Sequence, residues 1–189
     1  MTDPTSPADD PGWPKGTSAL KLILPGLMQR EIRRNPGDVL VLLRQSTLSF
    51  SLALILFGVV LPFLGLQGGQ AALYGGVLAG YAIVDMVVAH LVTRPLDGSS
   101  PTALRASYRT RFFLRVALAD SVAVFGFVFA FIGAGLWIYY PAGAFALIRI
   151  WTTAAPTRTR LERDQRALYE QGSDLVLIET LRRPPPDGA

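Results

Sequence analysis

Asp85, Asp120 and Arg149 are charged side chains that lie inside long apolar stretches of this sequence. A charged group near the centre of a bilayer costs at least about 2.5 kcal/mol, so such groups normally turn inward and pair. An arginine guanidinium stays protonated and can bind two carboxylates at once. We therefore expect Arg149 to pair with Asp120, with Asp85, or with both. The chemistry open to such a cluster is ion pairing or the carrying of a proton.

A polar vestibule on the cytoplasmic side of this cluster is the second expected feature. It consists of His90 at the end of one apolar stretch and of Ser46, Thr47 and Ser49 at the start of another. A single histidine is not a metal site, and the chain has no cysteine. The sequence also carries no complete catalytic motif and no nucleotide-binding loop. We therefore expect no metal, no cofactor and no enzymatic activity.

Four apolar stretches must position these side chains: residues 46–66, 71–92, 112–133 and 136–153. Each is close to the roughly 20 helical residues that cross a hydrocarbon layer of about 30 Å. The fourth is the shortest and contains Pro141 and Gly143. Because spanning helices tolerate proline and glycine, we favour a span with a local irregularity over a re-entrant segment. The sequence thus predicts an all-α integral membrane protein with four transmembrane helices arranged as two hairpins.

The basic residues outside the stretches predict the orientation. They cluster before the first stretch, between the second and third, and after the fourth, as Lys15, Lys21, Arg30, Arg33, Arg34 and Arg44; Arg94, Arg105, Arg109 and Arg111; and Arg158, Arg160, Arg163, Arg166, Arg182 and Arg183. The two short connections, 67–70 and 134–135, contain none. By the positive-inside rule, both termini and the basic loop 93–111 face the cytoplasm. Arg outnumbers Lys 16 to 2, which indicates a GC-rich bacterial genome, and we expect the protein in a bacterial plasma membrane.

The flanks of the bundle are expected to be cytoplasmic. Residues 1–18 and 184–189 have the composition of disordered tails. Residues 19–45 begin with an amphipathic, basic run that would lie on anionic lipid headgroups or dock a partner helix. Residues 154–183 predict a charged helix ended by Gly172 and then a second short helix.

Small and aromatic residues predict how the helices pack. Gly76 and Gly80 form a G-x-x-x-G step, and Gly126 offers a similar notch; these indicate packing within the bundle, with dimerisation as the alternative. Five aromatic residues fall near the expected interfaces and are interpreted as belt residues: Phe112, Phe113, Trp137, Tyr139 and Tyr140.

Residues 117–128, ALADSVAVFGFV, resemble the carboxylate helix of the rotary-ATPase proteolipid, in which an acid after Ala-Leu-x precedes a small residue and an aromatic–glycine pair. The resemblance implies that Asp120 would carry a proton. It covers this segment alone, with Asp where Glu is commoner, and the helix opens a hairpin where the proteolipid's acid helix closes one. We assign the chain to no family on this basis.

Two function classes follow from these features. The first is a non-enzymatic accessory subunit or assembly factor of a larger membrane complex, in which the charged cluster is structural. The second is a small transporter or channel for a proton or small solute that uses Asp85, Asp120 and Arg149. Expected partners are anionic lipid headgroups and other membrane subunits or further copies of the chain. Nucleic acid is not expected, because the topology already accounts for the net charge of +4.

Overall fold

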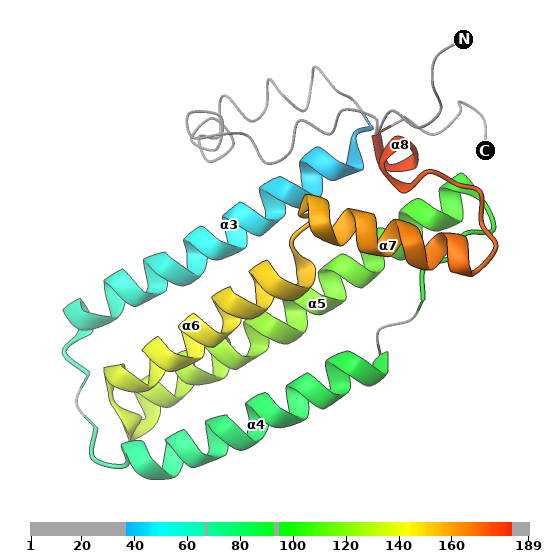
Figure 1. The fold of residues 1–189 in the computed structure, drawn as a ribbon. Helices are drawn as coiled ribbons and strands as arrows, with labels where there is room; N and C mark the ends of the chain where they lie inside the picture. Colours follow the sequence, from blue (N-terminus) through cyan, green and yellow to red (C-terminus); the bar gives the residue numbers. More distant parts are fainter. Residues whose placement is uncertain (1–36, 67, 93–94, 183–189) are drawn as a thin grey trace. The chain divides into compact units, whose positions relative to one another are not determined.

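The protein is all-helical over the residues that the computed structural model describes, which are 37–66, 68–92 and 95–182 (Figure 1). The first helix is α3 (Val39–Val60), which runs into a short 3₁₀ turn (Leu61–Leu64). The next are α4 (Ala71–Val92) and α5 (Pro101–Phe129), the latter continued by a π turn (Ala130–Ala134). A 3₁₀ turn (Leu136–Ile138), α6 (Tyr139–Arg149) and a π turn (Ile150–Ala154) follow in one run. The last helices are α7 (Arg158–Glu170) and α8 (Leu177–Arg182).

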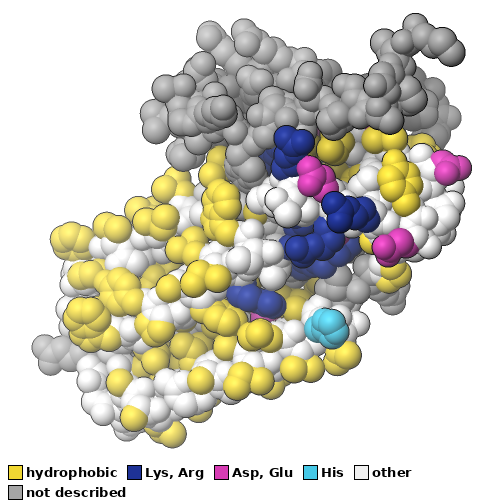
Figure 2. Space-filling model, viewed as in Figure 1, with side chains coloured by type: hydrophobic (Ala, Val, Ile, Leu, Met, Phe, Trp, Pro, Cys, Tyr) yellow, Lys and Arg dark blue, Asp and Glu magenta, His cyan; other side chains and the backbone are white. Residues whose placement is uncertain are grey.

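Three helices of the described chain are long and apolar enough to cross a membrane: Val39–Leu64, Ala71–Val92 and Pro101–Ala134. Large hydrophobic side chains on α4, among them Leu73, Ile83 and Leu91, are exposed. A helix that stays apolar on its exposed sides is typical of contact with lipid rather than with water. Figure 2 shows such side chains over much of the visible surface of residues 49–92 and 111–154. The predictions of an all-helical chain and of helices long and apolar enough to cross a membrane are confirmed at this level.

Two helices begin earlier than the apolar stretches suggested. α3 starts beside Asp38, whose Oδ1 accepts hydrogen bonds from the amides of Leu40 (2.9 Å) and Val41 (3.1 Å). α5 starts at Pro101 after Ser100, whose hydroxyl accepts the amide of Ala103 at 3.1 Å. Capping side chains and a proline in the first helical position fix these starts. Residues 101–111, interpreted from the sequence as part of a basic loop, are therefore the first three turns of α5.

The fourth apolar stretch is helical but irregular at its ends rather than at its centre. Pro141 lies in the first turn of α6, where its missing amide removes no helical hydrogen bond. The irregular turns are the 3₁₀ turn before Tyr139 and the π turn after Arg149. A tight connection precedes the stretch, with Gly133 at φ +116° and Gly135 at φ +83°, a backbone that favours glycine.

The described chain divides into two compact units. We call residues 49–92 and 111–154 the apolar unit, and residues 37–48, 95–110 and 155–182 the flanking unit. α3 and α5 each contribute to both units. The predicted segments 1–18 and 184–189, and nearly all of 19–45, lie outside the described residues.

The core of the apolar unit joins four helical segments. α6 lies along α5, and α3 and α4 flank this pair (Figure 1). The ring of Phe127 on α5 contacts that of Tyr139 on α6, with centroids 6.2 Å apart, and Tyr81 on α4 contacts Phe125 at 4.4 Å. The two hairpin tips also meet, since the amide of Gln70 donates to the carbonyl of Gly133 at 3.4 Å. These contacts hold the charged residues of α4, α5 and α6 in fixed positions.

The flanking unit contains the two helices expected in the C-terminal tail. Leu161 and Leu168 of α7 and Leu177 and Leu181 of α8 are fully buried. The chain turns after α7 at Gly172, with φ +79°, as predicted. Arg105 at the start of α5 donates from Nε to the carbonyl of Thr180, so α5 and α8 meet directly.

Gln165 is the polar link between α7 and α8. Its Nε2 donates to the carbonyl of Leu175 at 2.9 Å, and its Oε1 accepts the amide of Leu177 at 2.6 Å. We expect Gln165→Leu to destabilise α8 by about 1–3 kcal/mol, because it leaves two backbone groups without partners. Amide hydrogen exchange at Leu177 measures this. Arg166→Leu, an exposed change on the same helix, should leave the exchange rate unchanged, and equal rates in both variants would refute the role of Gln165.

Asp97 gives the connection before α5 a dependence on pH. Hydrogen bonds from the hydroxyl and the amide of Ser99 hold the pKa of Asp97 below its ordinary value of 3.8. A depressed pKa in the folded state means that the turn is stabilised above the ordinary pKa and loses this contribution as the pH falls through the lowered one. We expect Ser99→Ala to move the pKa of Asp97 upward, as measured by NMR titration of the carboxyl carbon. An unchanged pKa would show that the hydroxyl has no such effect.

Candidate functional site

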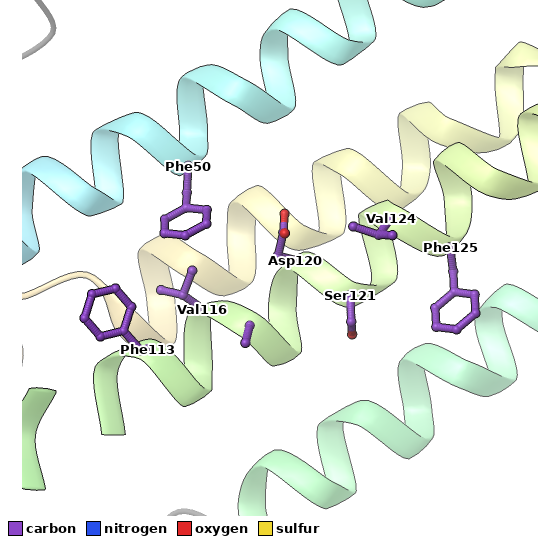
Figure 3. Close-up of a pocket in the computed structure, with 8 residues that line it drawn as sticks. Phe50, Phe113, Val116, Asp120, Ser121, Val124 and Phe125 are labelled. Carbon is purple, nitrogen blue, oxygen red and sulfur yellow. The ribbon is translucent and has the colours of Figure 1, made fainter. Parts of the chain in front are cut away.

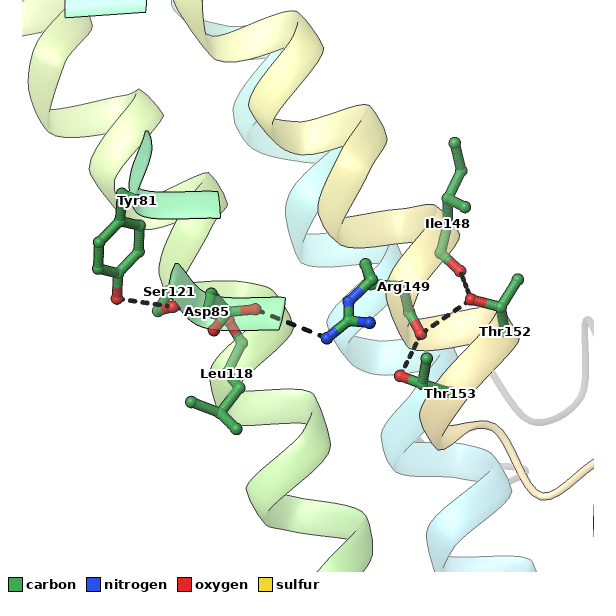
Figure 4. Close-up of polar contacts among 8 residues, drawn as sticks. All are labelled: Tyr81, Asp85, Leu118, Ser121, Ile148, Arg149, Thr152 and Thr153. Atoms are coloured by element: carbon green, nitrogen blue, oxygen red, sulfur yellow. Dashed lines mark hydrogen bonds and ion pairs between the residues drawn. The ribbon is translucent and has the colours of Figure 1, made fainter. Parts of the chain in front are cut away.

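The structure brings Arg149 to Asp85. Arg149 is the last residue of α6, and Asp85 lies on α4. The Nη2 atom of Arg149 is 3.7 Å from Oδ2 of Asp85 (Figure 4). The Asp85 side chain is 1% exposed and that of Arg149 is 18% exposed. One of the two pairings expected from the sequence is therefore present, and it joins α4 to α6 inside the apolar unit.

This ion pair lacks close hydrogen bonds. In the described chain neither carboxylate oxygen of Asp85 has a hydrogen-bond partner, and the Nε of Arg149 has none either. A bidentate arginine–carboxylate pair would instead have two short N–H···O bonds. The attraction between the two charges is thus the main compensation for burying Asp85. Removal of either partner would leave an isolated charge in an apolar environment.

A hydroxyl pair beside Asp85 links α4 to α5. The hydroxyl of Tyr81 donates to Ser121 Oγ at 3.1 Å, and Ser121 donates to the carbonyl of Leu118 at 2.6 Å (Figure 4). Sequence reasoning missed this contact. The available signal was the spacing, because Tyr81 precedes Asp85 by four residues and so shares its face of α4.

The sequence interpretation also missed Arg115, a cation inside the third apolar stretch. Its Nη1 donates to the carbonyl of Thr153 at 3.1 Å, in the π turn after α6. The hydroxyls of Thr152 and Thr153 donate, both at 2.7 Å, to the carbonyls of Ile148 and Arg149. The sequence does contain the signal for Arg115, because it is a charged residue inside an apolar stretch, as Arg149 is. These hydrogen bonds satisfy backbone carbonyls at the point where the regular α-helical hydrogen bonding of α6 ends.

Aromatic side chains attach α6 and the π turn that follows it to α3. The hydroxyl of Tyr139 donates to the carbonyl of Leu54 at 2.6 Å, and the indole of Trp151 donates to Ser51 Oγ at 3.0 Å. Tyr139 is buried, as is Phe112, so the interpretation of these two as belt residues is wrong. Both were placed by sequence position alone, which does not say which side of a helix faces inward. Trp137 is exposed, as the belt interpretation requires.

Asp120 is not paired with Arg149. In the part of the chain that the structure describes, it has no ion pair or hydrogen bond. It is half-buried in the wall of a groove of about 450 Å³ in the apolar unit (Figure 3). The groove is lined by Asp120 and Ser121 and by the apolar side chains of Phe50, Phe113, Val116, Ala117, Val124 and Phe125.

The residues of the expected vestibule either donate hydrogen bonds to their own helix or are exposed. The hydroxyls of Ser46 and Thr47 donate to carbonyls four residues earlier in α3, Leu42 (3.0 Å) and Leu43 (2.9 Å). Ser49 and His90 are exposed, the latter in the last turn of α4. Two of the three hydroxyls thus bond to the backbone of their own helix.

Of the three glycines expected to pack helices together, Gly126 lies at a helix contact in the described chain, and Gly76 and Gly80 do not. A Cβ on Gly126 would overlap the Cβ of Ala142, so this glycine permits the close approach of α5 to α6. Beyond the neighbouring backbone of α4 itself, no described atom lies within 4 Å of a Cβ built on Gly76 or Gly80. Both lie on the side of α4 opposite its three buried residues, Leu78, Asp85 and Ala89. Their expected role in packing is therefore not seen within the described chain.

The comparisons with known proteins give no relative. No protein-family model, curated protein or solved structure matches this chain.

Proposed function

We propose that this protein is a non-enzymatic, multi-pass membrane protein that serves as a subunit or assembly factor of a larger membrane complex. The observation that carries the proposal is the open side of α4. This apolar helix of 22 residues has three buried positions in the described chain, while Gly76 and Gly80 form a notch on the other side. Small residues of this kind let the backbones of two membrane helices approach closely. The open side of α4 thus fits a helix of another subunit.

The contacts among the polar side chains of the apolar unit support a structural role for them. Arg149 joins α6 to α4, Tyr81 joins α4 to α5, and Tyr139 joins α6 to α3. Polar bonds between membrane helices stabilise association and fix helix rotation. These groups hold the bundle together, and the outer surface remains free for partners.

The proposal includes four crossings with both termini in the cytoplasm of a bacterial cell. The stretch from Leu136 to Ala154 is helical throughout, in three segments. At 1.5 Å per residue such a run is close to the thickness of a hydrocarbon layer. The basic residues that flank the apolar stretches support the orientation. The flanking unit would then lie at the cytoplasmic leaflet and contact anionic headgroups.

Extraction of the tagged protein from its native membrane in a mild detergent tests this proposal. Sizing and mass spectrometry should find other membrane proteins in fixed stoichiometry. Gly80→Leu should release them by filling the notch, whereas Met86→Leu, an exposed apolar change elsewhere on α4, should not. Recovery of the wild-type chain alone, or as a homo-oligomer, would contradict the accessory role.

A small transporter for a proton or solute is the second candidate, and it is favoured by Asp120, which has no partner within the described ranges. On that account, wild-type protein in proteoliposomes carries a pH-driven flux above that of empty liposomes, and Asp120→Asn abolishes the flux while the protein stays folded. Absence of flux in folded wild-type protein removes this candidate.

A further inference from the structure

Among the described residues Asp120 has no hydrogen-bond or ion-pair partner, and it faces an apolar groove. Arg149, the cation expected beside it, lies 3.7 Å from Asp85 instead. Figure 3 shows Asp120 pointing from α5 toward α3 and Phe50 pointing from α3 toward α5. An anion in such a setting attracts a positive charge strongly, because the surroundings screen it poorly. The groove therefore has the charge complementarity for a cation.

The walls of the groove indicate what kind of cation fits. Three phenylalanine rings line it, those of Phe50, Phe113 and Phe125, together with Val116 and Val124. Aromatic faces attract cations, most strongly where water is excluded. The volume of about 450 Å³ lies within the ~300–1,000 Å³ range of small-molecule sites. A ligand with one positive charge and bulky apolar groups would match both the carboxylate and the walls.

An inorganic ion fits the groove poorly. Hard cations such as Mg²⁺ and Ca²⁺ take about six or more oxygen ligands, whereas the lining supplies one carboxylate and the Ser121 hydroxyl. That hydroxyl already donates to the carbonyl of Leu118 and accepts from Tyr81. The described residues contain no group of three or more His, Cys, Asp or Glu side chains that could hold a metal.

We propose that the groove binds a monovalent lipophilic organic cation, of the quaternary ammonium or phosphonium class. The charge of the ligand lies at Asp120, and its apolar groups lie against Phe50 and Phe113. Because such ions partition into bilayers, they can reach a groove in the apolar unit from the lipid. This proposal uses a different surface from the open side of α4 and does not rest on membership in a complex.

Equilibrium binding of radiolabelled tetraphenylphosphonium tests the proposal. The full-length protein is placed in nanodiscs of zwitterionic lipid at pH 8, and tetraphenylborate, an anion of the same size and shape, is measured in separate samples as the matched ligand. We expect saturable binding of the cation and no binding of the anion beyond that to empty nanodiscs. Binding of the cation no greater than to empty nanodiscs, or equal saturable binding of the anion, would overturn the proposal.

Paired variants locate the site. Asp120→Asn should weaken binding at least about tenfold, whereas Asp120→Glu should retain it. Glu170→Gln, which removes an exposed carboxylate at the end of α7, should have no effect. Phe50→Leu should weaken binding several-fold and Phe131→Leu, an exposed ring outside the groove, should not. Unchanged affinity in folded Asp120→Asn protein, checked by sizing and circular dichroism, would refute the site, and loss in both Asp120 variants would refute recognition of charge.

Discussion

Replacement of Arg149 by leucine is expected to destabilise the apolar unit by about 3 kcal/mol, because it leaves Asp85 buried without a counter-charge. The figure lies at the low end for a buried ion pair, since the Arg149 side chain is 18% exposed. Reversible unfolding in detergent micelles measures the change. The exposed pair of Arg158 and Glu162, at 2.9 Å, supplies a matched control. Arg158→Leu should cost at most about 0.5 kcal/mol, as is usual for pairs four residues apart on a helix surface.

A double-mutant cycle identifies the partner of Arg149. Asp85→Leu combined with Arg149→Leu should recover most of the lost stability, because it removes the isolated carboxylate. Asp120→Asn combined with Arg149→Leu should recover none of it, since Asp120 makes no ion pair with Arg149 in the structure. Rescue by Asp120→Asn rather than by Asp85→Leu would contradict the observed pairing.

Gly126→Ala is the second change with a large expected effect. The added methyl group would overlap the Cβ of Ala142, so α5 and α6 must move apart. We expect a loss of about 1–3 kcal/mol from overpacking, in spite of alanine's higher helix propensity. The same change at Gly80, which has no described atom near its Cβ, should be neutral or stabilising by up to about 1 kcal/mol.

A compensating substitution at Ala142 tests whether overlap with its Cβ causes the loss of stability in Gly126→Ala. Ala142→Gly in the Gly126→Ala background should restore stability, because the pair then presents one methyl group as in the wild type. Equal effects of Gly126→Ala and Gly80→Ala would show that the close approach of α5 and α6 is not what the glycine permits.

The long apolar helices could be predicted because composition alone encodes them. Long runs of Leu, Val, Ala and Phe gave the helices now seen as α3, α4 and α5. The ends of these helices could not be found from hydropathy, because caps such as Asp38 and Ser100 act on the backbone in polar sequence. The start of α5 at Pro101 could have been inferred from Ser100–Pro101, which is a typical helix-start signal.

The sequence predicts which charged residues belong to the candidate site, but it does not predict which of them pair. The free-energy cost of a charged side chain in a bilayer identifies Asp85, Asp120 and Arg149 as residues that must be paired or functional. Their positions along the predicted helices, however, placed all three at a similar depth and so could not say which acid pairs with Arg149. Which acid meets Arg149 depends on the rotation of α4 and α5, which is set by contacts such as Tyr81 to Ser121 and Gly126 to Ala142. Such contacts join residues about 15 to 40 positions apart, and no local pattern encodes them.

The number of membrane crossings is the claim on which the orientation of every other feature depends, and the absence of cysteine from the chain makes it directly measurable. Single cysteines are introduced at Gly69, Ser99 and Gln171, all of which are exposed, and are labelled in intact cells with a maleimide that does not cross membranes. Four crossings predict labelling at position 69, with positions 99 and 171 labelled only after the cells are opened. Labelling of position 171 in intact cells, with position 99 still protected, would mean that the stretch from Leu136 to Ala154 does not cross and would contradict the account.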